Sequence, residues 1–264
     1  MSAAPRRSRL LRIALILLLT LIALALGGCL LLDKPRPTGT AGAEADALAR
    51  RMMDAVDVDA WQRTGAVQWV FAKRQTHLWD RQRGFARVAW GGEREVLLDL
   101  ATRDGVATVR GQAVTDPTER GILLDAAWRH WVNDSFWLNP VAKLFDDGTE
   151  RALVTDDDGI ERLLITYNLG GVTPGDAYLW TPGDDGTPAD WRMWTAILPI
   201  DGVKASWRDW IALDTGARVS THHDIFFLDL VLSDVAGASD LATLLGPDAE
   251  DPFAALVAHL AQTR

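Results

Sequence analysis

Polar and apolar positions change their spacing along the chain, and each spacing predicts a different element. From Ala45 to Val58, apolar residues recur at helical intervals between charged residues, which predicts an amphipathic helix. Further along, apolar and polar residues alternate in segments such as 67–71, 95–100 and 162–168. Alternation buries one face of an extended segment, so these segments are expected to be strands.

Asp-Gly dipeptides mark the ends of the predicted strands. Both residues tolerate the positive φ that tight hairpin turns require, so the dipeptides predict consecutive antiparallel strands. They occur at 104–105, 147–148, 158–159, 185–186 and 201–202.

Three more helices interrupt or follow the strands. Asp116-Pro117 supplies the start signals of a helix that continues to about Val132. Ser239 is the expected cap of a short helix that ends at Gly246, and Asp251-Pro252 opens the last one. The pattern predicts an α+β fold: one large antiparallel sheet, curved by its twist into a half-barrel, with a few helices packed on one face or end.

The N-terminus has the pattern of a bacterial export signal. Four arginines within residues 5–12 precede an apolar run from Ile13 to Leu26. The run leads into Leu26-Gly27-Gly28-Cys29, which resembles the lipobox of bacterial lipoproteins. That resemblance implies cleavage before Cys29 and acylation of Cys29. An uncleaved anchor is the alternative, because about 20 residues from Ile13 are enough to span a bilayer.

These features divide the chain into a signal peptide at 1–28, a tether at 29–42 and a single β-rich domain at 43–264. Removal of the four leader arginines changes the formal charge from −9 to −13, so membrane attachment must depend on acyl chains at Cys29. Leu30 follows the cysteine, and by the enterobacterial sorting rule this implies an outer-membrane protein that faces the periplasm.

The composition and the absence of known motifs exclude several kinds of partner and site. The 36 Asp and Glu outnumber the 27 Lys and Arg, so the surface repels phosphate backbones and we expect no nucleic-acid partner. A single cysteine excludes a disulfide framework, a Cys-rich zinc site and a CxxC pair. The chain contains no nucleotide loop, zinc-protease pair or Gly-x-Ser-x-Gly motif, so we predict no cofactor.

Two polar clusters contain metal-ligating residue types, but we predict no metal at either. In the acidic run 156–159, Val154 and Ile165 stand where a calcium loop would have its first and last ligands. A solvated turn is the better interpretation of that run. In the segment 222–224, His222 and His223 are neighbours on a strand and therefore point to opposite faces.

Tryptophan is unusually frequent, with 12 Trp against 7 Phe and 2 Tyr. An indole combines a large apolar area with one donor, which suits cavity walls that meet acyl chains and polar heads as well as a Trp-rich core. Along 191–198 both faces carry apolar residues, so the sheet has either helices on both faces or one filled core and one concave apolar groove. The candidate ligand-binding residues are His77, Trp79, Trp137, Trp180, Trp191 and Trp194.

Two motifs carry a resemblance to known proteins. Asn133-Asp134-Ser135-Phe136-Trp137-Leu138, placed after the predicted helix, and Thr173-Pro174-Gly175-Asp176 are similar to segments of uncharacterised exported bacterial lipoproteins. Over roughly residues 61–232, the wider similarity is to lipoprotein carriers of the LolA/LolB type, which have a half-open antiparallel barrel closed by helices. The resemblance implies an apolar concave face that holds acyl chains, without catalysis.

The leading hypothesis is therefore a lipid-anchored, non-enzymatic envelope protein that binds a lipid or another apolar group. One alternative is a hydrolase of envelope glycans or lipids, with His77 and carboxylates such as Asp80, Asp134 or Asp176. The other is an assembly scaffold with a flat apolar patch. An unfilled concave face would favour binding, and a concave face packed solid by the protein's own helices would leave no site for a guest. A cleft that joins two of the polar candidates would favour the hydrolase.

Overall fold

The computed structural model describes residues 15, 20, 33–156 and 158–263. Cys29 and most of the predicted export signal lie outside the described residues, so cleavage and acylation stay predictions. Within the described part of the chain, no helix has both the length and the apolar character needed to cross a membrane.

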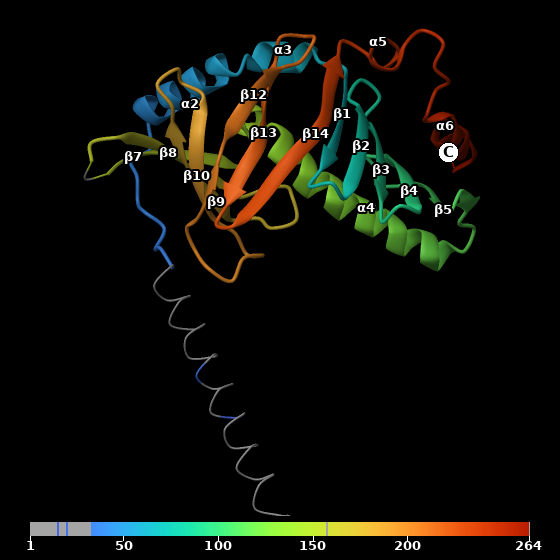
Figure 1. Cartoon of the computed structure of the whole chain (residues 1–264), viewed down its shortest axis with the longest axis horizontal. Helices are drawn as coiled ribbons and strands as arrows, with labels where there is room; N and C mark the ends of the chain where they lie inside the picture. Colours follow the sequence, from blue (N-terminus) through green and yellow to red (C-terminus); the bar gives the residue numbers. More distant parts are fainter. Residues whose placement is uncertain (1–14, 16–19, 21–32, 157, 264) are drawn as a thin grey trace, which may run out of the picture.

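One open antiparallel sheet of 14 strands forms the domain (Figure 1). Its order is β6-β5-β4-β3-β2-β1-β14-β13-β11-β10-β9-β8-β7, and β12 pairs with β13 beside this path. The predicted α+β class with one large antiparallel sheet is confirmed, and the sheet does not close into a barrel. The strands are β1 (Ala66–Phe71), β2 (Gln75–Asp80), β3 (Phe85–Trp90), β4 (Arg94–Asp99), β5 (Gly105–Val109), β6 (Gln112–Ala113), β7 (Thr149–Thr155), β8 (Glu161–Tyr167), β9 (Asp176–Pro182), β10 (Pro188–Trp194), β11 (Val203–Ser206), β12 (Arg208–Ala212), β13 (Arg218–Ile225) and β14 (Leu228–Ala238).

Helices cover one face of the sheet, which we call the inner face. α4 crosses it from β5 to β13, and α2 and α3 lie over β7 to β10 and the centre (Figure 1). α6 packs on the opposite, outer face, because it contacts Leu97 whereas α4 contacts the next residue, Leu98. The helices are α2 (Ala43–Ala55), α3 (Val58–Arg63), α4 (Pro117–Leu138), the 3₁₀ helix η1 (Pro140–Lys143), α5 (Leu241–Leu245) and α6 (Ala254–Thr263).

The helices differ from the sequence prediction in three places. The helix predicted for 45–58 ends at Ala55, and a second helix, α3, begins at Val58 after Asp57, whose φ of 50° interrupts the first. α4 continues to Leu138, so the segment 133–138 forms its last turns and does not follow the helix. No Gly or Pro interrupts this stretch before Pro140, and the local signals therefore allow the helix to continue. The cap of α5 is Asp240, whose carboxylate accepts a hydrogen bond from the Thr243 backbone N–H at 2.7 Å, and not Ser239.

Four of the five Asp-Gly dipeptides join consecutive strands as expected, whereas 147–148 lies between η1 and β7. Gly148, Gly159, Gly186 and Gly202 have φ between 69° and 84°, the left-handed region in which glycine is favoured. Gly105 is different: it begins β5 without positive φ, and a Cβ there would lie 2.1 Å from the Leu97 carbonyl oxygen. Close approach of two strands is therefore the reason for glycine at that position.

The predicted tether is not free from residue 33 onward, because residues 33–42 pack along the outer face of the sheet. Thr40 exchanges two backbone hydrogen bonds of 2.8 Å with Leu153 at the edge of β7. The Lys34 carbonyl accepts a hydrogen bond from Trp194 Nε1 at 2.8 Å. The segment therefore shields the β7 edge and the outer-face ring of Trp194.

Candidate functional site

Five aromatic rings gather on the inner face beneath the C-terminal end of α4. We call Trp137, Trp180, Trp191, Trp207 and His223 the aromatic cluster. Their centroids lie 4.8 Å (Trp137–Trp191), 4.6 Å (Trp180–Trp191), 4.9 Å (Trp191–Trp207) and 4.3 Å (Trp207–His223) apart. All five are buried, with exposed fractions of 0–8%.

Strand register brings these rings together. Trp180 of β9 is paired directly with Trp191 of β10, so both side chains leave the sheet on the same face. His223 reaches that face from β13, and Trp207 joins it from the link between β11 and β12. Trp137 then closes the cluster from α4, whose last turns lie over these strands.

The cluster contains polar atoms that are buried and lack a hydrogen-bond partner within the described part of the chain. They are Nε1 of Trp180, Trp191 and Trp207, and Nε2 of His223. His223 Nδ1 lies 3.1 Å from the Ser206 carbonyl oxygen, which can only accept, so Nδ1 carries the proton and Nε2 is an acceptor. Each unpaired buried group costs about 1–3 kcal/mol. Other buried atoms of the described residues are unpaired as well, among them Trp69 Nε1, Trp131 Nε1 and His77 Nδ1, and the cluster differs only in that its four atoms lie on rings in mutual contact.

Burial also sets the charge of His223. The surrounding rings exclude water and lower its pKa to about 4, although the hydrogen bond to the Ser206 carbonyl acts in the opposite direction. The imidazole is therefore neutral at physiological pH. The cluster can offer three N–H donors and one acceptor within apolar walls.

Only some of the predicted site residues lie in this cluster. The predicted residues Trp137, Trp180 and Trp191 lie together in the cluster. Trp207 and His223 also belong to it, and neither was among the residues predicted from the sequence. The sequence signal for both additions was weak, because a single tryptophan between strands and a histidine beside another histidine have no distinctive spacing.

The other three predicted residues lie elsewhere. Trp79 contacts Trp61 and Trp131 at centroid distances of 6.2 and 5.4 Å. Trp194 faces outward and is packed in a separate cluster with residues of β7, β8 and β9. His77 stacks on Trp69 at 4.5 Å. His77 and Trp79 are therefore part of the inner-face packing beside the aromatic cluster, Trp194 belongs to the outer face, and none of the three forms the walls of the cluster.

His77 does meet one of the carboxylates considered for a hydrolase. Its Nε2 lies 2.7 Å from Asp134 Oδ2, and Asn133 Nδ2 donates to Asp134 Oδ1 at 2.8 Å. The His77 and Asp134 side chains are only 0% and 2% exposed, so no open cleft leads to the pair. The contact joins α4 to β2 and acts as a latch between helix and sheet.

The two other carboxylates considered for catalysis are not near this pair. Asp80 is bound by Arg83 at 2.5 Å in the turn after β2. Asp176 accepts hydrogen bonds from the Thr173 hydroxyl at 2.5 Å and from the Ala196 backbone N–H at 3.1 Å, which brace loops at the far half of the sheet. Their contacts are those of structural turn residues.

A shallow open pocket of about 630 Å³ lies where residues 36–42 cross β7 and β8. Three of its charged residues are already engaged. Arg151 Nε donates to Asp46 Oδ1 at 2.6 Å, and this hydrogen bond holds the pKa of Asp46 below its usual range. Arg36 donates to the Thr166 hydroxyl in the same region. The pocket is therefore formed by the packed N-terminal segment and is separate from the aromatic cluster.

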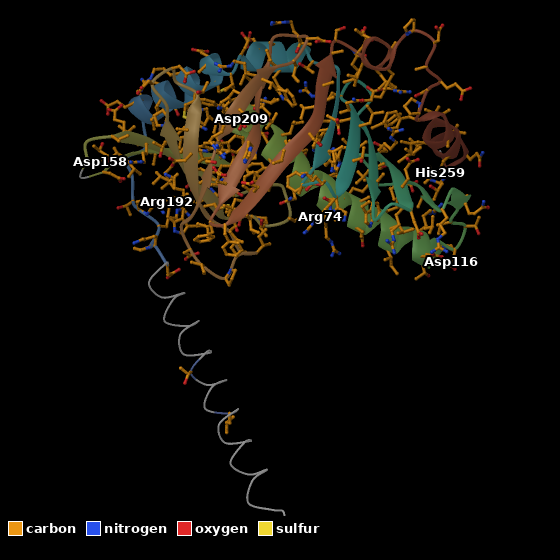
Figure 2. The ribbon with its side chains drawn as sticks, in the orientation of Figure 1. Arg74, Asp116, Asp158, Arg192, Asp209 and His259 are labelled. Carbon is orange, nitrogen blue, oxygen red and sulfur yellow. The ribbon has the colours of Figure 1, made fainter. Side chains whose placement is uncertain are left out.

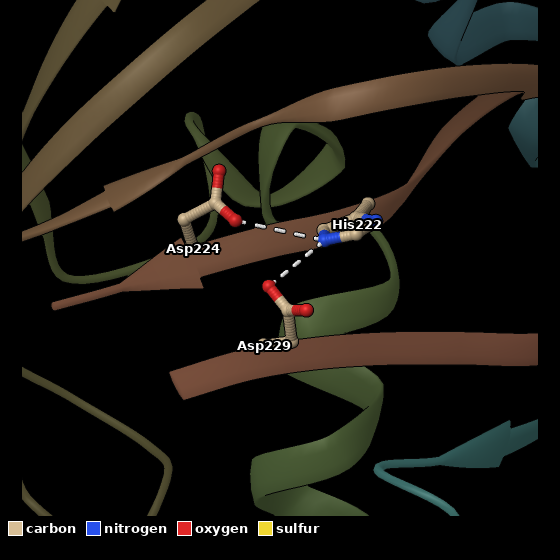
Figure 3. A group of neighbouring side chains, drawn as sticks. All are labelled: His222, Asp224 and Asp229. Atoms are coloured by element: carbon tan, nitrogen blue, oxygen red, sulfur yellow. Dashed lines mark hydrogen bonds and ion pairs between the residues drawn. The ribbon is translucent and has the colours of Figure 1, made fainter. Parts of the chain in front are cut away.

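On the outer face, His222 is surrounded by carboxylates (Figure 3). Its Nε2 lies 3.2 Å from Asp229 Oδ1 and 3.6 Å from Asp224 Oδ1, and these three ligand-type atoms all lie within 4.8 Å of one another. Arg208 already binds both oxygens of Asp224, at 2.7 and 2.6 Å. A cation would have to displace this guanidinium, so the group is best described as an ion-pair network.

The expectation that His222 and His223 face opposite sides of the sheet is confirmed, because His223 is fully buried in the aromatic cluster and His222 is partly exposed. The cross-strand neighbour Asp229 was missed, since strand pairing is not readable from the local pattern.

No protein-family model matches the chain, and no curated protein matches it either. The resemblance to lipoprotein carriers therefore stays a prediction from the motifs.

Proposed function

We propose that this protein is a lipid-anchored protein of the bacterial cell envelope that binds an acyl-bearing amphiphile within the aromatic cluster, without catalysis. The observation that carries the proposal is the set of unpaired polar atoms on contacting rings of that cluster. An ester, carboxyl or hydroxyl oxygen of the guest accepts from the indole N–H groups, and a hydroxyl group of the guest donates to His223 Nε2. The rings themselves supply the apolar surface for the acyl chain.

The cluster is closed by the protein's own side chains, so entry of a guest requires α4 to move. The polar contacts between α4 and β2 are few: the His77–Asp134 latch, and a 3.3 Å contact between Gln75 Nε2 and His130 Nδ1. Such a covering helix is compatible with a lid that opens for the guest and closes afterwards. The filled interior counts against a permanently open groove, and the proposal is therefore restricted to a gated one.

The anchor and its membrane are proposed from the lipobox at Cys29, with acyl chains that hold the protein on the periplasmic side of the outer membrane. The buried His77–Asp134 pair gives less support to a hydrolase, because a substrate would need access to groups that are enclosed.

The test of guest binding combines native mass spectrometry of the gently extracted protein with titration by a solvatochromic fatty-acid probe. We expect a co-purifying lipid and saturable probe uptake. Absence of both would contradict the proposal.

Trp191→Phe and Trp207→Phe test the donors, because they keep an aromatic ring and remove the N–H. Loss of one hydrogen bond weakens binding by about 0.5–1.5 kcal/mol, or up to about tenfold in Kd. Trp69→Phe is the matched control, since Trp69 Nε1 is also buried and unpaired among the described residues but its ring stacks on His77. Equal effects of all three substitutions would show that the N–H groups of the cluster do not recognise a guest.

A further inference from the structure

Exposed apolar side chains are concentrated in three loops of the domain. The loops are 168–175 between β8 and β9, 195–202 between β10 and β11, and 226–227 between β13 and β14, with the first residue of β14 beside the last loop. Their exposed members, which we call the apolar rim, are Leu169, Val172, Ile197, Phe226, Phe227 and Leu228.

Strand pairing puts these three loops at the same end of the sheet. Ala177 pairs with Trp194, so the start of β9 lies beside the end of β10. Ala205 pairs with Ile225, so the start of β11 lies beside the end of β13. Figure 1 shows the loops together at the lower end of the sheet, where the blue N-terminal segment also begins. The rim is therefore one surface made from distant parts of the sequence.

The tip of the β13–β14 hairpin is the most exposed part of the rim. Phe226 is 56% exposed and Phe227 is 92% exposed, so the fold gains almost nothing from burying the second ring. Phe226 also has φ 54°, a left-handed conformation that two-residue hairpin turns usually fill with Gly, Asn or Asp. Two aromatic residues at such a position are unfavourable for folding alone and indicate contact with an apolar partner.

The N-terminal segment fixes where the membrane must lie relative to this end. The Asp201 backbone N–H donates to Asp33 Oδ1 at 2.9 Å, and the Lys34 N–H donates to the Asp201 carbonyl at 3.1 Å. Residue 33 is thereby attached to the 195–202 loop of the rim. Cys29 is only four residues earlier, a reach of about 14 Å at full extension. Acyl chains on Cys29 would hold this end of the domain against the bilayer.

We propose that the apolar rim inserts into the surface of the bilayer that carries the anchor and so fixes the orientation of the domain. The inference rests on the acylation of Cys29 in the proposed function and is independent of guest binding in the aromatic cluster. Phe71 pairs with Leu232, four residues after the start of β14, so the adjoining β1–β2 turn points to the same end of the sheet. Its exposed Lys73 and Arg74 can meet lipid phosphates, and Figure 2 shows Arg74 on the lower side of the sheet.

The experiment compares two positions in the full-length, acylated protein. Phe227→Cys adds a thiol at the rim, and Asp184→Cys adds one in the exposed β9–β10 turn at the opposite end of the sheet. Acylation consumes the natural thiol of Cys29, so an environment-sensitive fluorophore reacts only at the new position. The labelled proteins are reconstituted into vesicles of phosphatidylethanolamine and phosphatidylglycerol, with or without brominated acyl chains.

We expect the probe at 227 to shift to the blue, brighten several-fold and be quenched by brominated lipid, while the probe at 184 stays in water. A probe at 227 that stays in water overturns the inference, and so does an intact mass that shows no acyl chains on Cys29. Native mass spectrometry of the same sample reports the guest separately. Lipid insertion at 227 in guest-free protein would uphold the rim and contradict binding in the aromatic cluster.

Discussion

His223 shows how burial of one side chain creates a pH dependence. The folded-state pKa of about 4 lies below the ordinary value of 6.5, because a charged imidazole is poorly solvated among the rings of Trp137 and Trp207. Between these two values the unfolded chain binds more protons than the folded one. The contribution of neutral His223 to stability is therefore complete above about pH 6.5 and decreases as the pH falls toward 4.

We expect the free energy of unfolding to fall by about 2 kcal/mol from this one residue between pH 7 and pH 5. Urea unfolding of the protein and of His223→Gln at both pH values measures it. Gln keeps a polar group able to reach the Ser206 carbonyl but does not titrate. If the two proteins lose the same stability on acidification, His223 is not the titrating group.

The sequence predicted the turns that contain glycine and missed turns that contain other residues. The Asp-Gly turns were found because glycine signals positive φ, whereas Ala72 and Lys73 adopt φ of 49° and 57° in the β1–β2 hairpin without any such signal. Phe226, with φ 54° in the β13–β14 hairpin, is another residue with positive φ that no local signal indicates. The register of the flanking strands imposes these conformations, and a local sequence pattern does not contain that information.

α4 is the element on which access to the aromatic cluster depends. Its first half packs on β3, β4 and β5, and its last turns bring Trp137 over the cluster. Asp134 lies between these two parts and accepts hydrogen bonds from His77 and Asn133. This buried latch is expected to slow the movement of the C-terminal half of the helix.

Asp134→Asn should weaken the latch, because a neutral amide replaces a carboxylate that accepts both contacts. We expect a loss of about 1–3 kcal/mol in unfolding free energy and faster uptake of the fatty-acid probe in stopped-flow mixing. Asp125→Asn, at an exposed position of the same helix, is the control and should change neither quantity. Lower stability with an unchanged uptake rate would mean that α4 does not gate the cluster.

At the scale of the whole molecule, a wide open sheet has two edges that must be protected from other chains. One edge is β6, which has only two residues. The other is β7, where the backbone N–H and C=O of Leu153 form hydrogen bonds with Thr40 of the N-terminal segment. Gly39 permits this approach, because a Cβ there would lie 2.7 Å from the Leu153 carbonyl oxygen. The segment that was predicted as a tether thus covers part of this edge.

Gly39→Ala should displace the segment from β7, lower stability by about 1–3 kcal/mol and promote self-association through the freed edge. Size-exclusion chromatography with light scattering, together with thermal unfolding, measures both effects. Gly121→Ala is the matched control: it is an exposed position in α4 with nothing near the added Cβ, and the change should stabilise the helix by about 0.5–1 kcal/mol. A monomeric Gly39→Ala protein of normal stability would exclude this role of the segment.

The sequence by itself determined the fold class, the strands near residues 67–71, 95–100 and 162–168, and four of the positive-φ turns, because these depend on local periodicity and on glycine. The tertiary structure decided which rings meet. Pairing of β9 with β10 and the crossing of α4 gathered Trp137, Trp180 and Trp191. The opposite directions of Trp191 and Trp194, in contrast, follow from strand alternation alone. The tertiary structure also determined that side chains fill the inner face and that residues 33–42 pack on the outer face. These outcomes depend on contacts between residues far apart in the chain, which local spacing does not encode.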